Sequence, residues 1–328
     1  MTDGGRRAVV VAVVGLRMSS LDVEEEVFSG LDVRLVRFPG ASADEIIAAA
    51  RDAEAILAGS MPRFPAEVIE ALPHLRAIVR YGIGVDSIDV RAAAERGVQV
   101  ANVPDYCIPE VATHTVVLIL AAARRLLPGM QAAREGRWDV GAVRPLPECE
   151  AQTVGLVGVG RIGQAVAARL RPFGFRLLAA DPVATAEAAR AAGADLVPLD
   201  ALLAEAHIVS LHLPLTAATR HLISRQVLTR MRPGAWLVNT ARGGLVDETA
   251  LLEALDSGRL AGAALDVLAQ EPPAADHPLL RHPRVLVTPH VAWYSERAVV
   301  EMRRKAAEEV RRLLCGEPLL HTVLPGGA

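Results

Sequence analysis

Residues 153–167 read TVGLVGVGRIGQAVA, an apolar run followed by a glycine-rich turn and the start of a helical pattern. Its glycines, Gly158, Gly160 and Gly163, have the spacing GxGxxG. In a dinucleotide-binding turn the first glycine permits a tight bend, the second lets the backbone approach a pyrophosphate, and the third lets the helix pack close to the strand. Strand–helix turns without a ligand also contain such glycines, so the surrounding residues carry the argument.

The residues that follow this turn favour a nicotinamide dinucleotide. Arg161 and Ile162 begin the predicted helix, whose N-terminal N–H groups would face the phosphates. Asp181 ends the next predicted strand, where a carboxylate can accept hydrogen bonds from the adenosine ribose. Residues 182–185, PVAT, contain no arginine that would offset this charge against a 2′-phosphate. We therefore expect NAD rather than NADP as the cofactor.

Short β-branched runs alternate with alanine-rich helical stretches on both sides of the turn. The runs are apolar on both faces, which is typical of parallel strands in a sheet covered by helices on both sides. The pattern restarts after a stretch rich in Arg and Pro at 137–151, so we predict an α/β fold with two doubly wound units. The expected strands are 8–16, 33–38, 55–59, 75–82, 98–104, 153–160, 175–181, 208–214, 235–241, 262–267 and 284–290. The expected helices include 42–53, 65–72, 161–173, 247–258 and 295–317.

The composition argues against several classes of partner. The 328 residues carry a formal net charge of −3 without a block of like charge, whereas nucleic-acid binding needs a basic face. The apolar run 116–123 is far below the ~20 residues that span a bilayer. The 3 cysteines show no CxxC pair or Cys/His ligand spacing, so we expect neither disulfides nor a metal site. We expect a cytoplasmic protein that binds neither nucleic acid nor membrane.

Four polar side chains mark the ends of predicted strands in the second half of the chain. Arg242, Asp266 and His290 end three of them, and Glu271 follows in the next loop. Ligands of open α/β sheets bind beyond the carboxyl ends of the strands. Arginine offers a bidentate fork for a carboxylate, and histidine suits proton donation to a developing alkoxide near neutral pH. The set predicts hydride transfer between a nicotinamide and a 2-keto or 2-hydroxy acid, with the Glu271 carboxylate orienting the imidazole.

Each of these side chains also has a structural interpretation. A single histidine at a strand end is often a satisfied structural group, and Arg242 fits a surface cation. Glu271 fits a loop acid before proline, and Asp266 fits a helix cap. Their occurrence together with the glycine turn favours the catalytic interpretation.

The chain resembles the D-isomer-specific 2-hydroxyacid dehydrogenase family over nearly its full length. The motifs GLVGVGRIG, LVNTARGGLVDE, AALDV…EPP and TPH match that family in order. The resemblance implies a flavodoxin-like substrate domain from 1–103 and 291–328, and a Rossmann NAD-binding domain from 104–290, with a cleft between them. It also implies a homodimer formed with the apolar helix near 109–127.

The resemblance also implies roles for individual residues. Arg242 would bind the substrate, Glu271 would pair with His290, and His290 would be the acid/base. Asp266 would lie near the nicotinamide. Further cofactor-binding positions implied by the family are Thr115, Pro214, Thr240 and Ala241.

A closer resemblance is to the branch that contains the C-terminal-binding-protein corepressors. IVRYGIGVDSID and TPHVAWYSERAVVEMRRKAAEEVRR resemble that branch, and Arg80 and Trp293 fall on its substrate-pocket positions. Phosphite dehydrogenase, a more distant relative, has a lysine where this chain has Arg80, which argues against phosphite as the substrate.

Aromatic residues concentrate near the expected substrate site. We expect Trp293, Tyr81 and Tyr106 to shape a pocket around the substrate side chain, although hinge packing is an alternative for these rings and for Tyr294. Backbone N–H groups of residues 82–84 would bind the substrate carboxylate. Arg80 would bind a second anionic group of the substrate, such as a phosphonate or a distal carboxylate. The expected substrate-binding residues are Arg80, Tyr81, Gly82, Ile83, Gly84 and Trp293.

The favoured function is an NAD-dependent oxidoreductase that acts on a small 2-keto or 2-hydroxy acid. Two alternatives stay open at this point. One is an NAD(H)-sensing, corepressor-like binding protein, and the other is a reductase dedicated to a phosphonate-bearing 2-keto acid.

Overall fold

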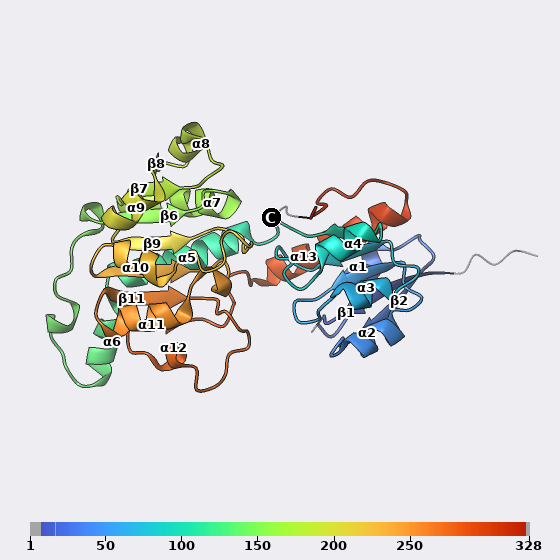
Figure 1. Cartoon of the computed structure of the whole chain (residues 1–328), viewed down its shortest axis with the longest axis horizontal. Helices are drawn as coiled ribbons and strands as arrows, with labels where there is room; N and C mark the ends of the chain where they lie inside the picture. The colour runs from blue at the N-terminus through green and yellow to red at the C-terminus, as the bar shows by residue number, and fades with distance from the viewer. Residues whose placement is uncertain (1–7, 17, 326–328) are drawn as a thin grey trace, which may run out of the picture. The chain divides into compact units, whose positions relative to one another are not determined.

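The structure is a computed structural model that describes residues 8–16 and 18–325. The chain divides into two compact units (Figure 1). Unit 1 contains the described residues up to Cys107 and those from Ser295 onward, and unit 2 is Ile108–Tyr294. The chain passes from unit 1 to unit 2 after residue 107 and returns after residue 294. Both positions lie a few residues later than the expected domain boundaries, after residues 103 and 290.

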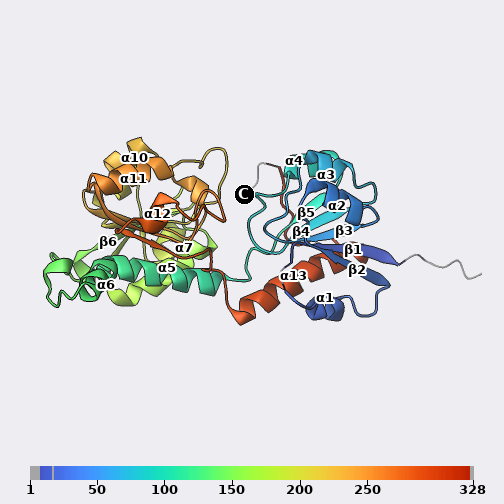
Figure 2. The same ribbon diagram turned by 90° about the horizontal axis from the view of Figure 1, so that it is seen from below.

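Unit 1 is a five-stranded parallel sheet with the order β2-β1-β3-β4-β5, which is the flavodoxin-like order. Helices α2, α3 and α4 cover one face, and α1 and α13 cover the other (Figure 2). The strands are β1 (Val9–Val14), β2 (Val33–Phe38), β3 (Ala55–Ala58), β4 (Ala77–Arg80) and β5 (Gln99–Ala101). The helices are α1 (Asp22–Val27), α2 (Ala43–Ala49), α3 (Ala66–Glu70), α4 (Val90–Glu95) and α13 (Glu296–Leu314).

Helix α13 ties the end of the chain to this sheet. Ser295 caps it by accepting a hydrogen bond from Ala298 N, and apolar residues at helical spacing face β3 and β4. Arg303 lies on the buried face and pairs with the wholly buried Glu24 of α1, with its Nη2 atom 2.6 Å from Oε2. Buried charges are retained when they are paired, so this contact fixes how α1 and α13 meet.

Unit 2 is a seven-stranded parallel sheet with the order β12-β11-β10-β9-β6-β7-β8. Counted from β6, this is the Rossmann order with a seventh strand added at β12, and the order reverses between β6 and β9. The strands are β6 (Thr153–Val157), β7 (Arg176–Ala180), β8 (Asp195–Leu196), β9 (Ile208–Leu211), β10 (Ala235–Asn239), β11 (Leu260–Leu265) and β12 (Val285–Val287).

Two apolar clusters sandwich the sheet of unit 2. One lies under α5, α7 and α8, and the other under α9, α10, α11 and α12. The α-helices are α5 (Ile108–Ala123), α6 (Leu126–Arg134), α7 (Arg161–Leu170), α8 (Ala186–Ala191), α9 (Leu199–Glu205), α10 (Arg225–Arg230), α11 (Glu248–Asp256) and α12 (Pro278–Arg281). Four 3-10 turns, η1 (Gly141–Val143), η2 (Cys149–Ala151), η3 (Arg171–Phe173) and η4 (Gly243–Leu245), complete the unit as described.

The predicted α/β class with two parallel sheets is confirmed. The expected strand 284–290 is shorter, because the chain leaves the sheet after β12 and turns around Asp266. Within residues 8–16 and 18–325, no single helix is long and apolar enough to cross a bilayer; α5 and α6 reach that length only together, across a 64° bend.

Candidate active site

The glycine turn after β6 lies where the strand order of unit 2 reverses. Gly158 has φ +99°, and a Cβ added there would lie 2.8 Å from the carbonyl oxygen of His212 on the neighbouring chain segment. A Cβ on Gly163 would lie 2.3 Å from Gly158 O. Backbone conformation therefore requires the first glycine, and close packing of α7 against the turn requires the third.

Gly160 is different, because a Cβ added there would meet no atom within 4 Å apart from the adjoining backbone. It is the N-cap of α7, and no side chain caps the helix at this end. Packing within the protein does not explain this glycine, whereas a phosphate approaching the N–H groups of the first turn does. The turn therefore fits a dinucleotide pyrophosphate. Arg161 is exposed beside it, and Ile162 packs against the apolar cluster under α7.

Asp181 stands directly after β7, next to the same turn. Its Oδ2 atom accepts a hydrogen bond from Val159 N at 2.8 Å, and Oδ1 accepts from Val183 N at 2.9 Å. These bonds fix the carboxylate against the glycine turn. A carboxylate has about four acceptor sites, so it can still accept a hydroxyl.

His212 lies behind the turn, after β9. Its Nε2 atom is 3.0 Å from Ser210 Oγ, and Nδ1 is buried without a hydrogen-bond partner among the described residues. Burial lowers the pKa of His212 from its usual 6.5 to about 4. The ring is therefore neutral at physiological pH.

Arg242 follows β10 in a turn held by Asn239. Asn239 is 1% exposed; its Nδ2 donates to Arg242 O at 2.8 Å, and its Oδ1 accepts from Ala241 N at 3.0 Å. The next residue, Gly243, packs against the backbone after β11, since an added Cβ would lie 1.9 Å from the carbonyl carbon of Leu268. The loop that carries Arg242 therefore touches the loop that leads to Glu271.

Glu271 and His290 form a close polar pair in this region. Oε2 of Glu271 lies 2.5 Å from Nδ1 of His290, and Oε1 accepts from Leu268 N at 3.0 Å. Burial raises the pKa of the Glu271 carboxyl, but the hydrogen bond and charge of His290, the Leu268 N–H and the charge of Arg242 outweigh it and hold that pKa below its usual value. The pair joins the loops after β11 and β12, with the Arg242 charge close by.

Asp266 is buried and organises the chain around His290. Its side chain is 0% exposed; Oδ1 accepts from Val291 N at 3.0 Å, and Oδ2 accepts from Ala292 N at 2.9 Å. Its backbone oxygen accepts from His290 N at 2.8 Å. Asp266 therefore holds the loop of His290 instead of presenting its carboxylate at the surface, and it does not cap a helix.

The other expected cofactor positions lie around the same strand ends. Thr115 is wholly buried on α5; it donates to Val111 O, so its 2.7 Å contact with Thr240 Oγ1 uses the hydroxyl hydrogen of Thr240. The side chain of Thr115 thus supports Thr240. Pro214, after β9, is exposed, and its carbonyl oxygen accepts from Thr219 Oγ1. Ala241 is half-buried, and its carbonyl oxygen accepts from Arg242 Nη1 at 2.7 Å.

A family model described as D-isomer specific 2-hydroxyacid dehydrogenase, NAD binding domain, matches residues 116–292. The chain belongs to the D-isomer specific 2-hydroxyacid dehydrogenase family. Residues 116–292 of this chain are the family's NAD-binding domain, so the expected cofactor, NAD, is confirmed. The finer resemblance to the corepressor branch stays a prediction.

Relatives of this chain are named for different acids. The chain is 38% identical over 295 residues to D-3-phosphoglycerate dehydrogenase of Archaeoglobus fulgidus. The matched region covers 90% of this chain and 55% of that protein. The chain is 41% identical over 276 residues to glyoxylate reductase of Korarchaeum cryptofilum, which covers 83% of each. A solved D-lactate dehydrogenase from Aquifex aeolicus, complexed with NAD and lactic acid, has a TM-score of 0.85 at 26% identity, with 96% of this chain and 99% of that chain covered. The chain spans about half the length of the D-3-phosphoglycerate dehydrogenases it matches.

The expected substrate-binding residues do not all belong to one unit. The segment 80–84, with Arg80, Tyr81, Gly82, Ile83 and Gly84, belongs to unit 1, whereas Trp293 belongs to unit 2 and makes an edge-to-face contact with Tyr294, with ring centroids 5.6 Å apart. Arg80 Nη1 donates to the carbonyl oxygen of Tyr81, which folds the guanidinium over Gly82. Asn102 Nδ2 holds the same segment by donating to Ile83 O at 2.6 Å.

The expectation for the ring of Tyr81 needs a correction. The residue is 3% exposed, and its hydroxyl donates to Glu24 Oε1 at 2.8 Å. Burial and the Glu24 charge raise the pKa of Tyr81 well above its usual value. The ring faces the interior of unit 1 because Glu24, itself paired with Arg303, offers a buried acceptor there. Tyr106 is also buried, at 7% exposure, whereas Tyr294 is 50% exposed.

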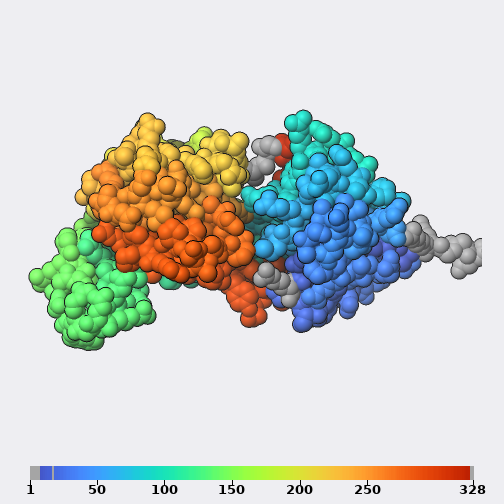
Figure 3. All heavy atoms as spheres, turned by 60° about the horizontal axis from the view of Figure 1, so that its bottom comes forward, coloured from blue at the N-terminus to red at the C-terminus, as the bar shows by residue number. Residues whose placement is uncertain are grey.

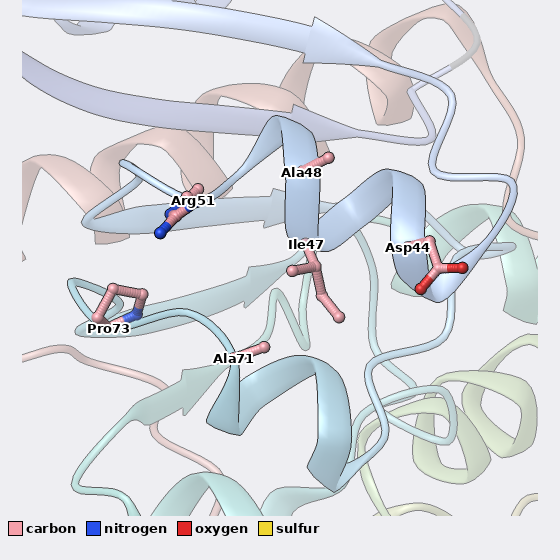
Figure 4. Close-up of a pocket in the computed structure, with 6 residues that line it drawn as sticks. All are labelled: Asp44, Ile47, Ala48, Arg51, Ala71 and Pro73. Atoms are coloured by element: carbon pink, nitrogen blue, oxygen red, sulfur yellow. The ribbon is translucent and has the colours of Figure 1, made fainter.

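Several residues that hold this site were not predicted. Asn239 lies in the motif LVNTARGGLVDE. An asparagine at the end of a strand is a turn signal, and this signal could have identified the role of Asn239. Thr288 begins the TPH motif but had no role assigned to it, and His114, 3.0 Å from its hydroxyl, carried no local signal. A separate pocket in unit 1 has Ile47 and Ala71 facing each other, with Asp44 and Arg51 on opposite sides (Figure 4). None of its residues belongs to the motifs discussed above.

Proposed function

We propose that the protein transfers a hydride between NAD(H) and a small 2-keto or 2-hydroxy acid of the D configuration. The observation that carries this proposal is the 2.5 Å pair of His290 and Glu271, with the Arg242 charge beside it. The three residues follow β10, β11 and β12, in the same sheet as the glycine turn. This is the edge where open α/β sheets bind their ligands.

The proposed roles follow from the chemistry of each group. When bound, the dinucleotide supplies or receives the hydride. Arg242 binds the substrate carboxylate through its planar fork. His290 gives a proton to the keto oxygen as that oxygen becomes an alkoxide, and takes it back in the reverse direction. Because Nδ1 faces Glu271, the proton is exchanged through Nε2.

Glu271 is proposed to stabilise the charged imidazole. Its lowered pKa keeps the carboxyl ionised, and an ionised partner favours the imidazolium form that donates the proton. Leu268 N donates to the other carboxylate oxygen and fixes the Glu271 side chain. The fixed carboxylate in turn sets the ring orientation of His290. Glu271 thus acts by staying ionised and by orienting the His290 ring.

The cofactor positions extend the proposal. The N–H groups at Gly160 and Arg161 are suited to the pyrophosphate, and Asp181 to the adenosine ribose, which favours NAD over NADP. Thr240, Ala241 and Pro214 remain proposed cofactor contacts. Arg80, Gly82, Ile83, Gly84 and Trp293 remain proposed substrate contacts.

The quaternary state and the location also belong to the proposal. Exposed apolar side chains on α5, α6 and the following stretch favour a homodimer; they are Val117, Leu126, Met130, Trp138 and Val140. The segment after α6 stands out from unit 2 as a lobe (Figure 3). None of the three cysteines, Cys107, Cys149 and Cys315, forms a disulfide, which suits a reducing cytoplasm.

The test is oxidation of NADH and of NADPH with a panel of 2-keto acids that includes glyoxylate, pyruvate, 3-phosphohydroxypyruvate, and phosphonylated and aromatic acids. We expect turnover with at least one acid and a lower KM for NADH than for NADPH. The variant His290→Ala should lose about 10²–10⁴-fold in kcat, because it removes the acid/base. Its dissociation constant for NADH should stay within about twofold.

Two outcomes would contradict the proposal. Near-parental turnover by His290→Ala would remove the assigned role. Tight NADH binding without turnover on any acid would favour a dinucleotide-sensing protein instead. A strict preference for phosphonylated acids would keep the reaction and narrow the substrate class.

A further inference from the structure

A hydrogen-bonded chain leads from helix α5 to the loop of His290. The Oγ1 hydroxyl of Thr288 donates to Asp266 Oδ1 at 2.5 Å, and Nε2 of His114 lies 3.0 Å from the same hydroxyl. A hydroxyl has one hydrogen, and the carboxylate already takes it. His114 must therefore carry its hydrogen on Nε2 and donate to Thr288.

The carboxylate at the end of this chain shapes the backbone that presents His290. Val291 N and Ala292 N donate to its two oxygens, and His290 N donates to the backbone oxygen of Asp266. Two successive N–H groups thus bind the carboxylate, and the N–H before them binds the backbone of the same residue. His290, the residue before these two, has φ +52°, in the left-handed region that a non-glycine residue seldom adopts.

The position of His114 supports a role in this arrangement. His114 lies on α5, and it lines one hollow together with Val291 and Ala292, the two residues that bind the carboxylate. Its side chain is 24% exposed, and its Nε2 atom is also 3.6 Å from Asp266 Oδ1. An imidazole N–H aimed at this hydroxyl fixes the Thr288 hydroxyl toward Asp266 and limits the rotation of the carboxylate.

We propose that His114 is a positioning residue for the acid/base His290, acting through Thr288 and Asp266. The inference rests on the proposed function of His290 and extends it to a helix distant in sequence. His114 touches neither substrate nor dinucleotide in this role. It keeps the Asp266 carboxylate in the rotamer that accepts from the N–H groups of residues 291 and 292, so that Nδ1 of His290 stays aimed at Glu271.

The experiment uses full-length protein and four single variants. His114→Leu removes the donor, Thr288→Val removes the hydroxyl at nearly constant volume, and His114→Gln keeps an N–H donor near the position of Nε2. Thr113→Val is the matched control. The Thr113 hydroxyl donates to Pro109 O on the same helix and takes no part in the hydrogen bonds that link His114, Thr288 and Asp266. We expect His114→Leu and Thr288→Val each to lose about tenfold in kcat, with NADH affinity within about twofold.

Two further results are expected if the residues act as one chain. His114→Gln should recover most of the lost kcat. The double variant His114→Leu/Thr288→Val should lose no more than either single variant, because each breaks the same chain. Additive losses, or no recovery in His114→Gln, would overturn the proposal.

A spectroscopic readout separates this inference from the proposed reaction. The short hydrogen bond between Nδ1 of His290 and Glu271 should give a far-downfield imidazole N–H proton signal, assigned by its absence in His290→Ala. We expect the signal to shift or broaden in His114→Leu and Thr288→Val, and to be unchanged in Thr113→Val. An unchanged signal in all three would overturn the positioning role even in an active enzyme. Absence of turnover in the parent with the expected shifts would count against the reaction alone.

Discussion

His290 combines exposure, a close carboxylate and an uncommon backbone conformation. Its side chain is 43% exposed, and its φ of +52° lies in a region that costs a non-glycine residue roughly 1–2 kcal/mol. The two hydrogen bonds from residues 291 and 292 to the Asp266 carboxylate, at about 1.5–3 kcal/mol each, offset that cost. Strain held by its surroundings is characteristic of functional sites.

His212 gives a prediction about stability at acid pH. Its pKa in the folded protein is about 4, whereas an unfolded chain protonates this residue near 6.5. Between these values the unfolded state binds more protons than the folded state, so the free energy of unfolding falls as the pH falls. Replacing His212 by Gln should make the loss of unfolding free energy between about pH 7 and pH 5 smaller by about 2 kcal/mol. Denaturant titrations of the full-length protein at each pH, following the unfolding of unit 2, measure this difference.

The control for this experiment is His74→Gln, since His74 is exposed in unit 1. It should leave the pH dependence of unfolding as in the parent. Equal losses in the parent and in His212→Gln would show that His212 is not held neutral.

At the scale of elements, the start of α7 separates glycines required by the fold from a glycine suited to a ligand. A Cβ on Gly163 would meet Gly158 O at 2.3 Å, whereas a Cβ on Gly160 would meet no atom within 4 Å apart from the adjoining backbone. The φ of Gly160 is −66°, which alanine adopts without strain. The two glycines therefore make a matched pair of sites on one helix.

The prediction contrasts alanine at the two positions. Gly163→Ala should lose about 1–3 kcal/mol of unfolding free energy, because its methyl group overlaps backbone. Gly160→Ala should stay within about 0.5 kcal/mol of the parent and weaken NADH binding about tenfold or more, because the methyl group fills the space of the pyrophosphate. Thermal unfolding and NADH fluorescence titration measure both quantities. Parental NADH affinity in Gly160→Ala would exclude the turn as the phosphate site.

At the scale of the whole molecule, both units are parallel sheets covered by helices on two faces, and unit 2 carries exposed apolar side chains after α6. Trp138 is 91% exposed and Val140 is 56% exposed, in the lobe that follows α6. Exposed apolar groups that cluster in this way mark association surfaces. The proposed homodimer would cover this part of unit 2.

Sedimentation velocity tests the homodimer. Trp138→Arg should raise the dimer dissociation constant by about 30-fold or more, which corresponds to the ~2 kcal/mol typical of a central interface tryptophan. Val183→Arg is the control, because Val183 is 88% exposed in unit 2 and lies outside the lobe. A monomeric parent, or equal effects of both substitutions, would contradict the proposal.

The sequence determined the parts of this protein whose signals are local. Runs that are apolar on both faces predicted both parallel sheets, and the glycine spacing predicted the turn after β6. The motifs also pointed to Arg242, Glu271 and His290. Helices such as α1 and α4 were not predicted, because each spans fewer than two turns and is too short for a periodic pattern.

Only the tertiary structure decided which groups meet. The Asp266 carboxylate faces the interior because two N–H groups after β12 donate to it. The Tyr81 ring faces the interior because its hydroxyl donates to Glu24, which pairs with Arg303. His114 reaches the loop of His290 because α5 packs on the sheet of unit 2, far from that loop in sequence. Residue types and their spacing fix local backbone preference and chemistry, whereas the partner of a buried polar group depends on packing between distant segments.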